Sequence, residues 1–200
     1  MINKENARKE SKYQRKKLFK MIGKNCISKS SLFNLILSLK KKLLLKSIGI
    51  YYPIGTEISP LKLIEICNEL DLTVSLPVIS KNSYYLSFRK WDGKKSLKKT
   101  YYGISEPLSY NKLTIPDIIF VPLLAYDKDL NRLGYGKGYY DKTIEKLRER
   151  KLKNNNPFLA IGLAYDEQII EKVPTKSHDQ KMDMIITEKK ILYKKRDILI

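Results

Sequence analysis

The residues best suited to chemistry lie at positions 131–141, which read NRLGYGKGYYD. The glycines alternate with larger residues, at Gly134, Gly136 and Gly138. Glycine permits unusual backbone angles, and a glycine-rich turn that enters a helix can point several N–H groups at one phosphate. Arg132 adds a planar guanidinium group and Lys137 adds a flexible ammonium group, both positively charged. No Gly-Lys-Ser/Thr occurs here, so the run is not a Walker A sequence. It predicts a phosphate-binding loop, with an ordinary tight turn as the alternative.

Two aspartates are candidate metal ligands near this loop. Asp141 lies one turn inside the helix expected after the glycines, and Asp179 lies in the loop sequence KSHDQKMD. Mg²⁺ favours one or two carboxylates together with phosphates and waters. The sequence does not place the two aspartates side by side, and Asp141 could instead simply complement the helix dipole. The lone histidine, His178, is expected to be structural rather than a catalytic base.

A carboxylate and several tyrosines indicate a second kind of ligand. Glu57, in PIGTEIS, follows an expected strand, and open α/β sheets bind ligands beyond the carboxyl ends of their strands. The alternative is an exposed loop acid. The tyrosines Tyr51, Tyr52, Tyr101 and Tyr102 lie near loops and together could sandwich an aromatic ring system.

The N-terminal segment places three cations on one helix face. Residues 4–22 contain good helix formers and no Gly or Pro. At 100° per residue, Lys4, Arg8 and Arg15 fall within roughly 40° of one another, on the side that carries the apolar residues. Inward-facing charges need partners. Either their stems snorkel over the edge of the core, or they grip a bound anion.

The elements that must position these residues alternate between strand and helix. The patterns predict helices at 4–22, 30–46, 61–70, 142–151 and 167–172, and strands at 47–52, 72–79, 84–91, 117–121, 158–163 and 183–187. Ser59 and Pro60 are expected to cap the third helix, and the strands at 72–79 and 84–91 to pair. Residues 94–99 are expected to form a solvated loop. This alternation indicates an α/β open sheet.

Composition excludes several classes of protein. The 200 residues are 42% hydrophobic and 30% charged, which is globular rather than disordered. Cys26 and Cys67 are too few for a disulfide scaffold. The apolar stretch 32–45 is interrupted by lysines, whereas a membrane span needs about 18 apolar residues, and no leader sequence is recognisable. A cytoplasmic protein is expected. The net charge of +19 fits either AT-rich codon usage with a solvated surface or a nucleic-acid footprint.

Several segments of the sequence resemble those of a known family. The segments PDIIFVPLLAYDKDLNRLGYGKGYYDK and SHDQKMDMIITE, with YYPIGTEIS and YYGISEP upstream, are similar to the 5-formyltetrahydrofolate cyclo-ligase (5,10-methenyltetrahydrofolate synthetase) family. The opening KENARKESKYQR fits the Lys-x-x-x-Arg start of that family. The resemblance runs from Lys4 to about Glu188. It implies a three-layer α/β/α, mostly parallel sheet, with residues 1–200 as one domain.

The resemblance also implies the reaction and its site. The family uses ATP and Mg²⁺ to convert 5-formyltetrahydrofolate into 5,10-methenyltetrahydrofolate, ADP and phosphate. Asp141 and Asp179 would ligate Mg²⁺, and Arg132 and Lys137 would be the catalytic cations. The residues implied for ATP are Lys4, Arg8, Arg132, Leu133, Gly134, Tyr135, Gly136, Lys137, Gly138, Tyr139 and Tyr140. Those implied for the folate are Tyr52, Glu57, Tyr102, Tyr135 and Tyr139.

Two rival functions are weighed against this one. An RNA-binding module would use the basic surface, but the chain shows no RNP-type motif, KH-type GXXG loop or zinc knuckle. A degenerate folate or nucleotide binder would keep the fold without the reaction, yet the glycines and both aspartates are retained. The expected partners are therefore small molecules, with no specific nucleic acid and no membrane, and the protein is expected to be a monomer.

Overall fold

The structure is a computed structural model that describes residues 3–80, 83–100, 103–156 and 158–194. Its helices are α1 (Lys4–Ile22), α2 (Lys29–Leu43), α3 (Lys62–Glu69) and α4 (Tyr139–Lys153), with a 3₁₀ turn η1 (Asp166–Gln168). Its strands are β1 (Ser47–Gly49), β2 (Thr73–Ile79), β3 (Leu86–Lys90), β4 (Leu97–Lys99), β5 (Ser105–Pro107), β6 (Leu113–Thr114), β7 (Ile118–Pro122), β8 (Ala125–Tyr126), β9 (Arg132–Leu133), β10 (Leu159–Leu163), β11 (Met184–Ile186) and β12 (Ile191–Tyr193). None of the helices in these ranges is long and apolar enough to cross a membrane.

The main sheet has the order β12-β11-β10-β7-β1-β2-β3-β6. Pairing is parallel from β11 through β10, β7 and β1 to β2, and antiparallel for β12, β3 and β6 at the two edges. The chain therefore leaves β1 in one direction toward β2 and later returns to β7 on the other side. The gap beyond the carboxyl ends of β1 and β7 is the switch point where such sheets bind ligands.

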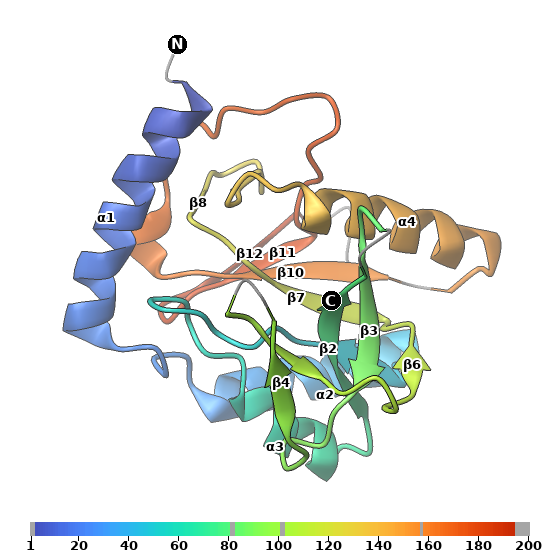
Figure 1. Cartoon of the computed structure of the whole chain (residues 1–200). Coiled ribbons are helices and arrows are strands. Elements are labelled where there is room, and N and C mark those ends of the chain that lie inside the picture. The colour runs from blue at the N-terminus through green and yellow to red at the C-terminus, as the bar shows by residue number, and fades with distance from the viewer. Residues whose placement is uncertain (1–2, 81–82, 101–102, 157, 195–200) are drawn as a thin grey trace.

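Strand β7 shows how the sheet is covered on both faces. Ile118 and Phe120 pack with the residues of α2 and α3, whereas Ile119 and Val121 pack with Ile144 and Leu147 of α4. Successive residues of a strand point to opposite faces, so an unbroken apolar strand needs a helix layer on each side. Helix α1 lies along one side of the molecule and α4 above the sheet (Figure 1). The predicted three-layer α/β fold is confirmed.

Several predicted boundaries were wrong, each for a local reason. The second helix ends at Leu43, because Leu44 adopts a left-handed conformation with φ of 50°. The first strand ends at Gly49 rather than at residue 52, and the chain then turns toward the site. Helix α3 begins at Lys62, so Pro60 lies before it rather than in its first turn. Part of the predicted 94–99 loop is strand β4, which pairs with β5.

The helix predicted at 167–172 is also wrong, since only the short turn η1 forms there. The side-chain nitrogen of Gln168 donates to the carbonyls of Leu123 and Leu124, at 3.2 and 2.7 Å. Ile169 is then extended, and the Ile170 amide donates to the Tyr126 carbonyl at 2.8 Å. These pairings with another segment replace the local hydrogen bonds that a longer helix would need. The predicted pairing of 72–79 with 84–91 is confirmed as β2 and β3.

Candidate active site

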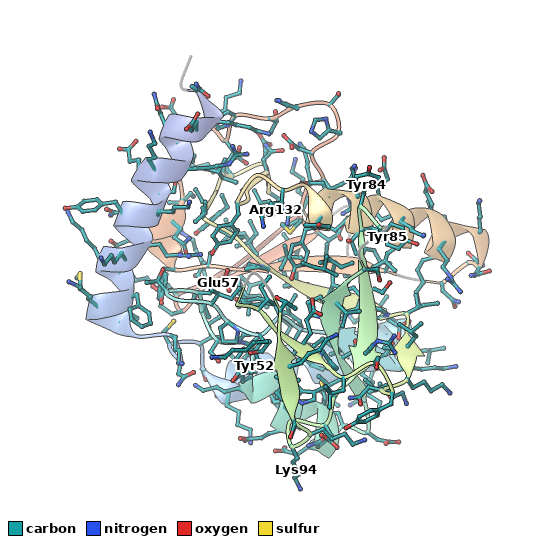
Figure 2. The ribbon with its side chains drawn as sticks, in the orientation of Figure 1. Tyr52, Glu57, Tyr84, Tyr85, Lys94 and Arg132 are labelled. Atoms are coloured by element: carbon teal, nitrogen blue, oxygen red, sulfur yellow. The ribbon has the colours of Figure 1, made fainter. Side chains whose placement is uncertain are left out.

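One pocket of about 870 Å³ opens at the switch point of the sheet. The site residues predicted from the sequence line it, with two exceptions. Arg15 lies outside the lining, and Tyr102, like Tyr101, lies outside the described residues. The pocket has two unlike ends. Cations, the glycine loop and the two aspartates form one end, and apolar side chains with two glutamates form the other. In Figure 2, Arg132 lies near the start of α4, with Glu57 and Tyr52 below it.

The glycine loop joins β9 to the N-terminus of α4. Gly136 and Gly138 have φ of +101° and +71°, conformations that side chains larger than hydrogen strain to adopt. A Cβ at Gly136 would lie 3.0 Å from the Arg8 Cζ, so the missing side chain also lets this guanidinium approach. The loop therefore brings backbone amides, a helix N-terminus and a cation together. The Leu133 side chain is buried against other elements, which leaves its backbone on the side of the loop.

Helix α1 supplies the cations, and Asn3 caps it by accepting a hydrogen bond from the Glu5 amide. Lys4 forms an ion pair with Asp179 at 2.5 Å, and the Arg8 Nε donates to the Gly134 carbonyl at 3.0 Å. Both side chains reach the pocket, as the anion-gripping interpretation requires.

Arg15 behaves differently from the other two cations. Its Nε donates to the Thr56 hydroxyl at 3.0 Å, and its Nη1 donates to the Leu123 carbonyl at 3.2 Å. Its guanidinium also lies 5.4 Å from the centre of the Tyr135 ring. Arg15 is not among the pocket residues, and protein acceptors satisfy it. It holds α1 against the segments that carry Glu57 and the strand ends, a positioning role that the sequence pattern did not reveal.

Arg132 and Asp141 form a buried ion pair beside the glycine loop. The Arg132 Nη2 lies 2.8 Å from the Asp141 Oδ1, which also accepts from the Gln180 amide at 3.0 Å. The Arg132 guanidinium lies 5.5 Å from the centre of the Tyr140 ring. Its Nε is buried with no hydrogen-bond partner in the part of the chain that the structure describes. A buried unpaired donor on a cation at a pocket wall fits an anionic ligand.

The two candidate metal ligands, Asp141 and Asp179, line the same pocket. Burial alone would raise the pKa of the Asp179 carboxyl, but the Lys4 ammonium and the Lys176 amide outweigh it and hold this pKa below its usual range. Within the described ranges no group of three or more acidic, histidine or cysteine side chains gathers to hold a metal. Two carboxylates that line one pocket fit Mg²⁺, which takes its remaining ligands from phosphates and water.

Glu57 lies at the other end of the pocket and is only 4% exposed. Its Oε1 accepts from the Tyr135 hydroxyl at 2.6 Å, and its Oε2 accepts from the Ile54 amide at 2.8 Å. Burial raises the pKa of this carboxyl, although both hydrogen bonds oppose the rise. The Tyr52 ring meets the Trp91 ring edge to face, with 6.1 Å between centroids. A flat, apolar surface beside a carboxylate suits a heteroaromatic ring that carries N–H donors.

Glu106 is a pocket residue that the sequence patterns did not predict. This residue of β5 lines the pocket with its side chain buried, close to Ile79 and Ile104. It belongs to the motif YYGISEP, which carried part of the family resemblance, but no role was assigned to it. The signal that could have drawn attention to it is an acid directly before a proline, within a motif that carries the resemblance.

Comparisons with known proteins show the family to which the chain belongs. The profile of the 5-formyltetrahydrofolate cyclo-ligase family matches residues 1–188. The 5-formyltetrahydrofolate cyclo-ligase of Haemophilus influenzae is 35% identical over 139 residues, which are 67% of this chain and 71% of that protein. The enzyme of the same name from Escherichia coli K12 is 27% identical over 150 residues, 72% of this chain and 79% of that protein.

Two solved structures share the fold. The NMR structure of Aquifex aeolicus 5,10-methenyltetrahydrofolate synthetase superposes with a TM-score of 0.72 at 25% identity, covering 96% of this chain and 93% of that one. The 5,10-methenyltetrahydrofolate synthetase of Mycoplasma pneumoniae superposes with a TM-score of 0.64 at 22% identity, covering 94% and 99%.

Proposed function

The chain belongs to the 5-formyltetrahydrofolate cyclo-ligase family, and from this premise we propose that it uses ATP and Mg²⁺ to close 5-formyltetrahydrofolate to 5,10-methenyltetrahydrofolate. The single observation that carries the proposal is the pocket with two unlike ends. A cationic glycine loop suits a nucleotide's phosphates, and an apolar wall with carboxylates suits a reduced pterin. One pocket that holds both can bring a phosphoryl group to a formyl oxygen.

At the phosphate end, the side chains of Lys4, Arg8 and Lys137 and the amides of residues 134–138 bind the phosphates in this proposal. Arg132 neutralises charge as the terminal phosphoryl group moves. Phosphoryl transfer needs little covalent help from a protein, so its catalysis rests on positioning and on stabilising charge. The buried pair between Arg132 and Asp141 fixes the guanidinium plane before the ligand arrives.

Asp141 and Asp179 would hold Mg²⁺ at this same end. When bound, the ion would withdraw charge from the phosphate oxygens. For Asp179 to ligate it, the Lys4 ammonium must exchange part of its contact with the carboxylate for contact with a phosphate. The short Lys4–Asp179 pair therefore keeps a cation and a carboxylate ready in the positions that the charged ligand needs.

At the folate end, Glu57 accepts from N–H groups of the pterin, and Tyr52 and Tyr139 flank its ring. Tyr135 stands between the two ends, because it belongs to the glycine loop and its hydroxyl reaches Glu57. The proposed use of Tyr102 lies outside the described residues.

The chemistry proceeds in two steps. The formyl oxygen attacks the terminal phosphorus, ADP leaves, and the carbon becomes an iminium phosphate bonded to N5. N10 then attacks this carbon, the C–O bond breaks, and phosphate departs as N10 loses its proton. Oxygen of an amide is a poor leaving group and phosphate is a good one, which is why the reaction needs ATP. No protein nucleophile takes part.

The test is the appearance of methenylfolate absorbance from purified protein with 5-formyltetrahydrofolate. We expect turnover only with both ATP and Mg²⁺, with one ADP formed per methenyl product. Turnover at the same rate without ATP, or none by folded protein with all components, would refute the proposal. Lys4→Gln should lower kcat/KM at least about tenfold, since a charge-assisted hydrogen bond is worth about 1.5–3 kcal/mol. Lys29→Gln is the matched control, because Lys29 pairs with Glu65 and Glu69 on a helix away from the pocket.

A further inference from the structure

Glu106 is a buried acidic residue of the pocket, and the proposed reaction assigns it no role. It lies in β5, in register with Lys98 of β4, and only 3% of its surface is exposed. Its Oε1 accepts a hydrogen bond from the Ile79 amide at 2.9 Å. The side chain lines the pocket, as do Pro77 of β2 and Leu86 of the paired strand β3.

The protein gives this carboxylate little compensation for its burial. Across the described residues, no cation lies within ion-pair distance of Glu106, and the Ile79 amide is its one hydrogen-bond donor. Asp117 and Asp127, by contrast, each accept several hydrogen bonds from the protein. Asp117 accepts from two amides, a hydroxyl and the Lys151 ammonium. Asp127 accepts from three amides and an asparagine side chain. Those two acids stabilise the fold, whereas one carboxylate oxygen of Glu106 remains available to accept a hydrogen bond from a ligand.

Glu57 has less acceptor capacity left than Glu106. Both of its oxygens already accept, one from the Tyr135 hydroxyl and one from the Ile54 amide. A ligand with several N–H donors must share these oxygens or displace the tyrosine. The second oxygen of Glu106 has no such competitor, and it lies on an apolar wall where water compensates a charge poorly.

We propose that Glu106 accepts hydrogen bonds from the 2-amino and N3–H donors of the pterin ring, and so decides that this pocket takes a 2-amino-4-oxopteridine. The inference rests on the proposed function. A carboxylate with a free oxygen on the wall of a flat apolar slot matches this donor edge, and Glu57 then receives donors elsewhere on the ring. A ring that lacks the 2-amino group offers Glu106 one donor fewer, a loss that sites built around hydrogen bonds discriminate strongly.

The test compares 5-formyltetrahydrofolate with its 2-desamino-2-methyl analogue in equilibrium binding and in turnover. The wild-type protein should prefer the natural substrate by at least about tenfold, as expected for a charge-assisted hydrogen bond. In Glu106→Gln the amide oxygen can still accept from the Ile79 amide, so the fold contact is kept while the charge is removed. This variant should bind the natural substrate about tenfold more weakly and lose most of its preference over the analogue. The KM for ATP should stay within about twofold.

Two further variants separate a recognition role from a structural one. Glu106→Asp keeps the charge but withdraws it by one methylene, so it should retain part of the preference. Glu65→Gln, at an exposed helix position away from the pocket, should leave both affinities unchanged. An unchanged preference in Glu106→Gln and Glu106→Asp, or an equal loss of ATP and folate affinity, would overturn the inference. If the wild-type protein binds no 5-formyltetrahydrofolate at all, the proposed function itself fails.

Discussion

Replacing Tyr135 by phenylalanine removes one hydroxyl from the link between the glycine loop and Glu57. That hydroxyl donates to the Glu57 Oε1 at 2.6 Å, and the carboxyl is 4% exposed. Burial raises the pKa of Glu57, and the Tyr135 hydroxyl is the strongest of the contacts that oppose this rise. The variant should therefore have a still higher Glu57 pKa.

The effect on stability depends on whether Glu57 is ionised. A hydrogen bond to a charged acceptor contributes about 1.5–3 kcal/mol, and one to a neutral acceptor about 0.5–1.5 kcal/mol. Because the pKa of Glu57 is raised on folding, the folded protein keeps a proton that the unfolded chain has already lost. Stability from this group therefore falls as pH rises from the usual carboxyl range through the folded-state pKa. The variant should lose about 0.5–1.5 kcal/mol at a pH below the folded-state pKa of Glu57 and about 1.5–3 kcal/mol at a pH above it.

Urea unfolding of the wild-type protein and the variant between pH 4 and pH 8 measures this difference. Tyr51→Phe is the matched control, since the Tyr51 hydroxyl donates to the neutral Ile58 carbonyl at 2.6 Å in the same buried region. The unfolding free energy that Tyr51→Phe loses should be the same at every pH. If the loss in Tyr135→Phe is also independent of pH, the hydroxyl does not stabilise the carboxylate and the reasoning about Glu57 is wrong.

Three further predictions concern the phosphate end of the pocket. Asp141→Asn should lower kcat/KM about 10- to 100-fold while the fold persists, because the amide oxygen can still accept from Arg132; activity and circular dichroism measure the two effects. Gly136→Ala should weaken Mg-ADP binding in calorimetry about tenfold or more, because its φ is +101° and a Cβ would press on Arg8. Asp179 has a lowered pKa, so its contribution to stability is present above the usual aspartate range and lost as pH falls; in urea unfolding, the difference between wild type and Asp179→Asn should shrink on acidification.

Matched controls exist for these variants. Gly23→Ala introduces similar backbone strain, with φ of +77°, but meets nothing within 4 Å, and should leave Mg-ADP affinity unchanged. Asp129→Asn removes an exposed acid paired with Lys194, and should change neither activity nor the pH dependence of unfolding. Equal losses in a variant and its control, or full activity in Asp141→Asn, would contradict the corresponding assignment.

The glycine loop and the sheet around it follow from local patterns in the sequence. Alternating glycines before a helix-forming segment predicted the turn into α4, and the apolar run at 117–121 predicted a strand. The spacing of Lys4 and Arg8 predicted that both would share one face of α1. These predictions succeed because the side-chain directions of a helix or a strand repeat every few residues. The buried face of each element can therefore be recognised from residues that are close in the sequence.

The pairing of the site residues came only from the tertiary structure. Lys4 and Asp179 form an ion pair although they are 175 positions apart, and Tyr135 bonds Glu57 across 78 positions. The turn η1 replaced a predicted helix because Gln168 found partners on another segment. Which acid keeps a free oxygen, as Glu106 does, depends on which donors the folded chain brings to it. The order of strands in the sheet decides those contacts, and no local repeat in the sequence encodes that order.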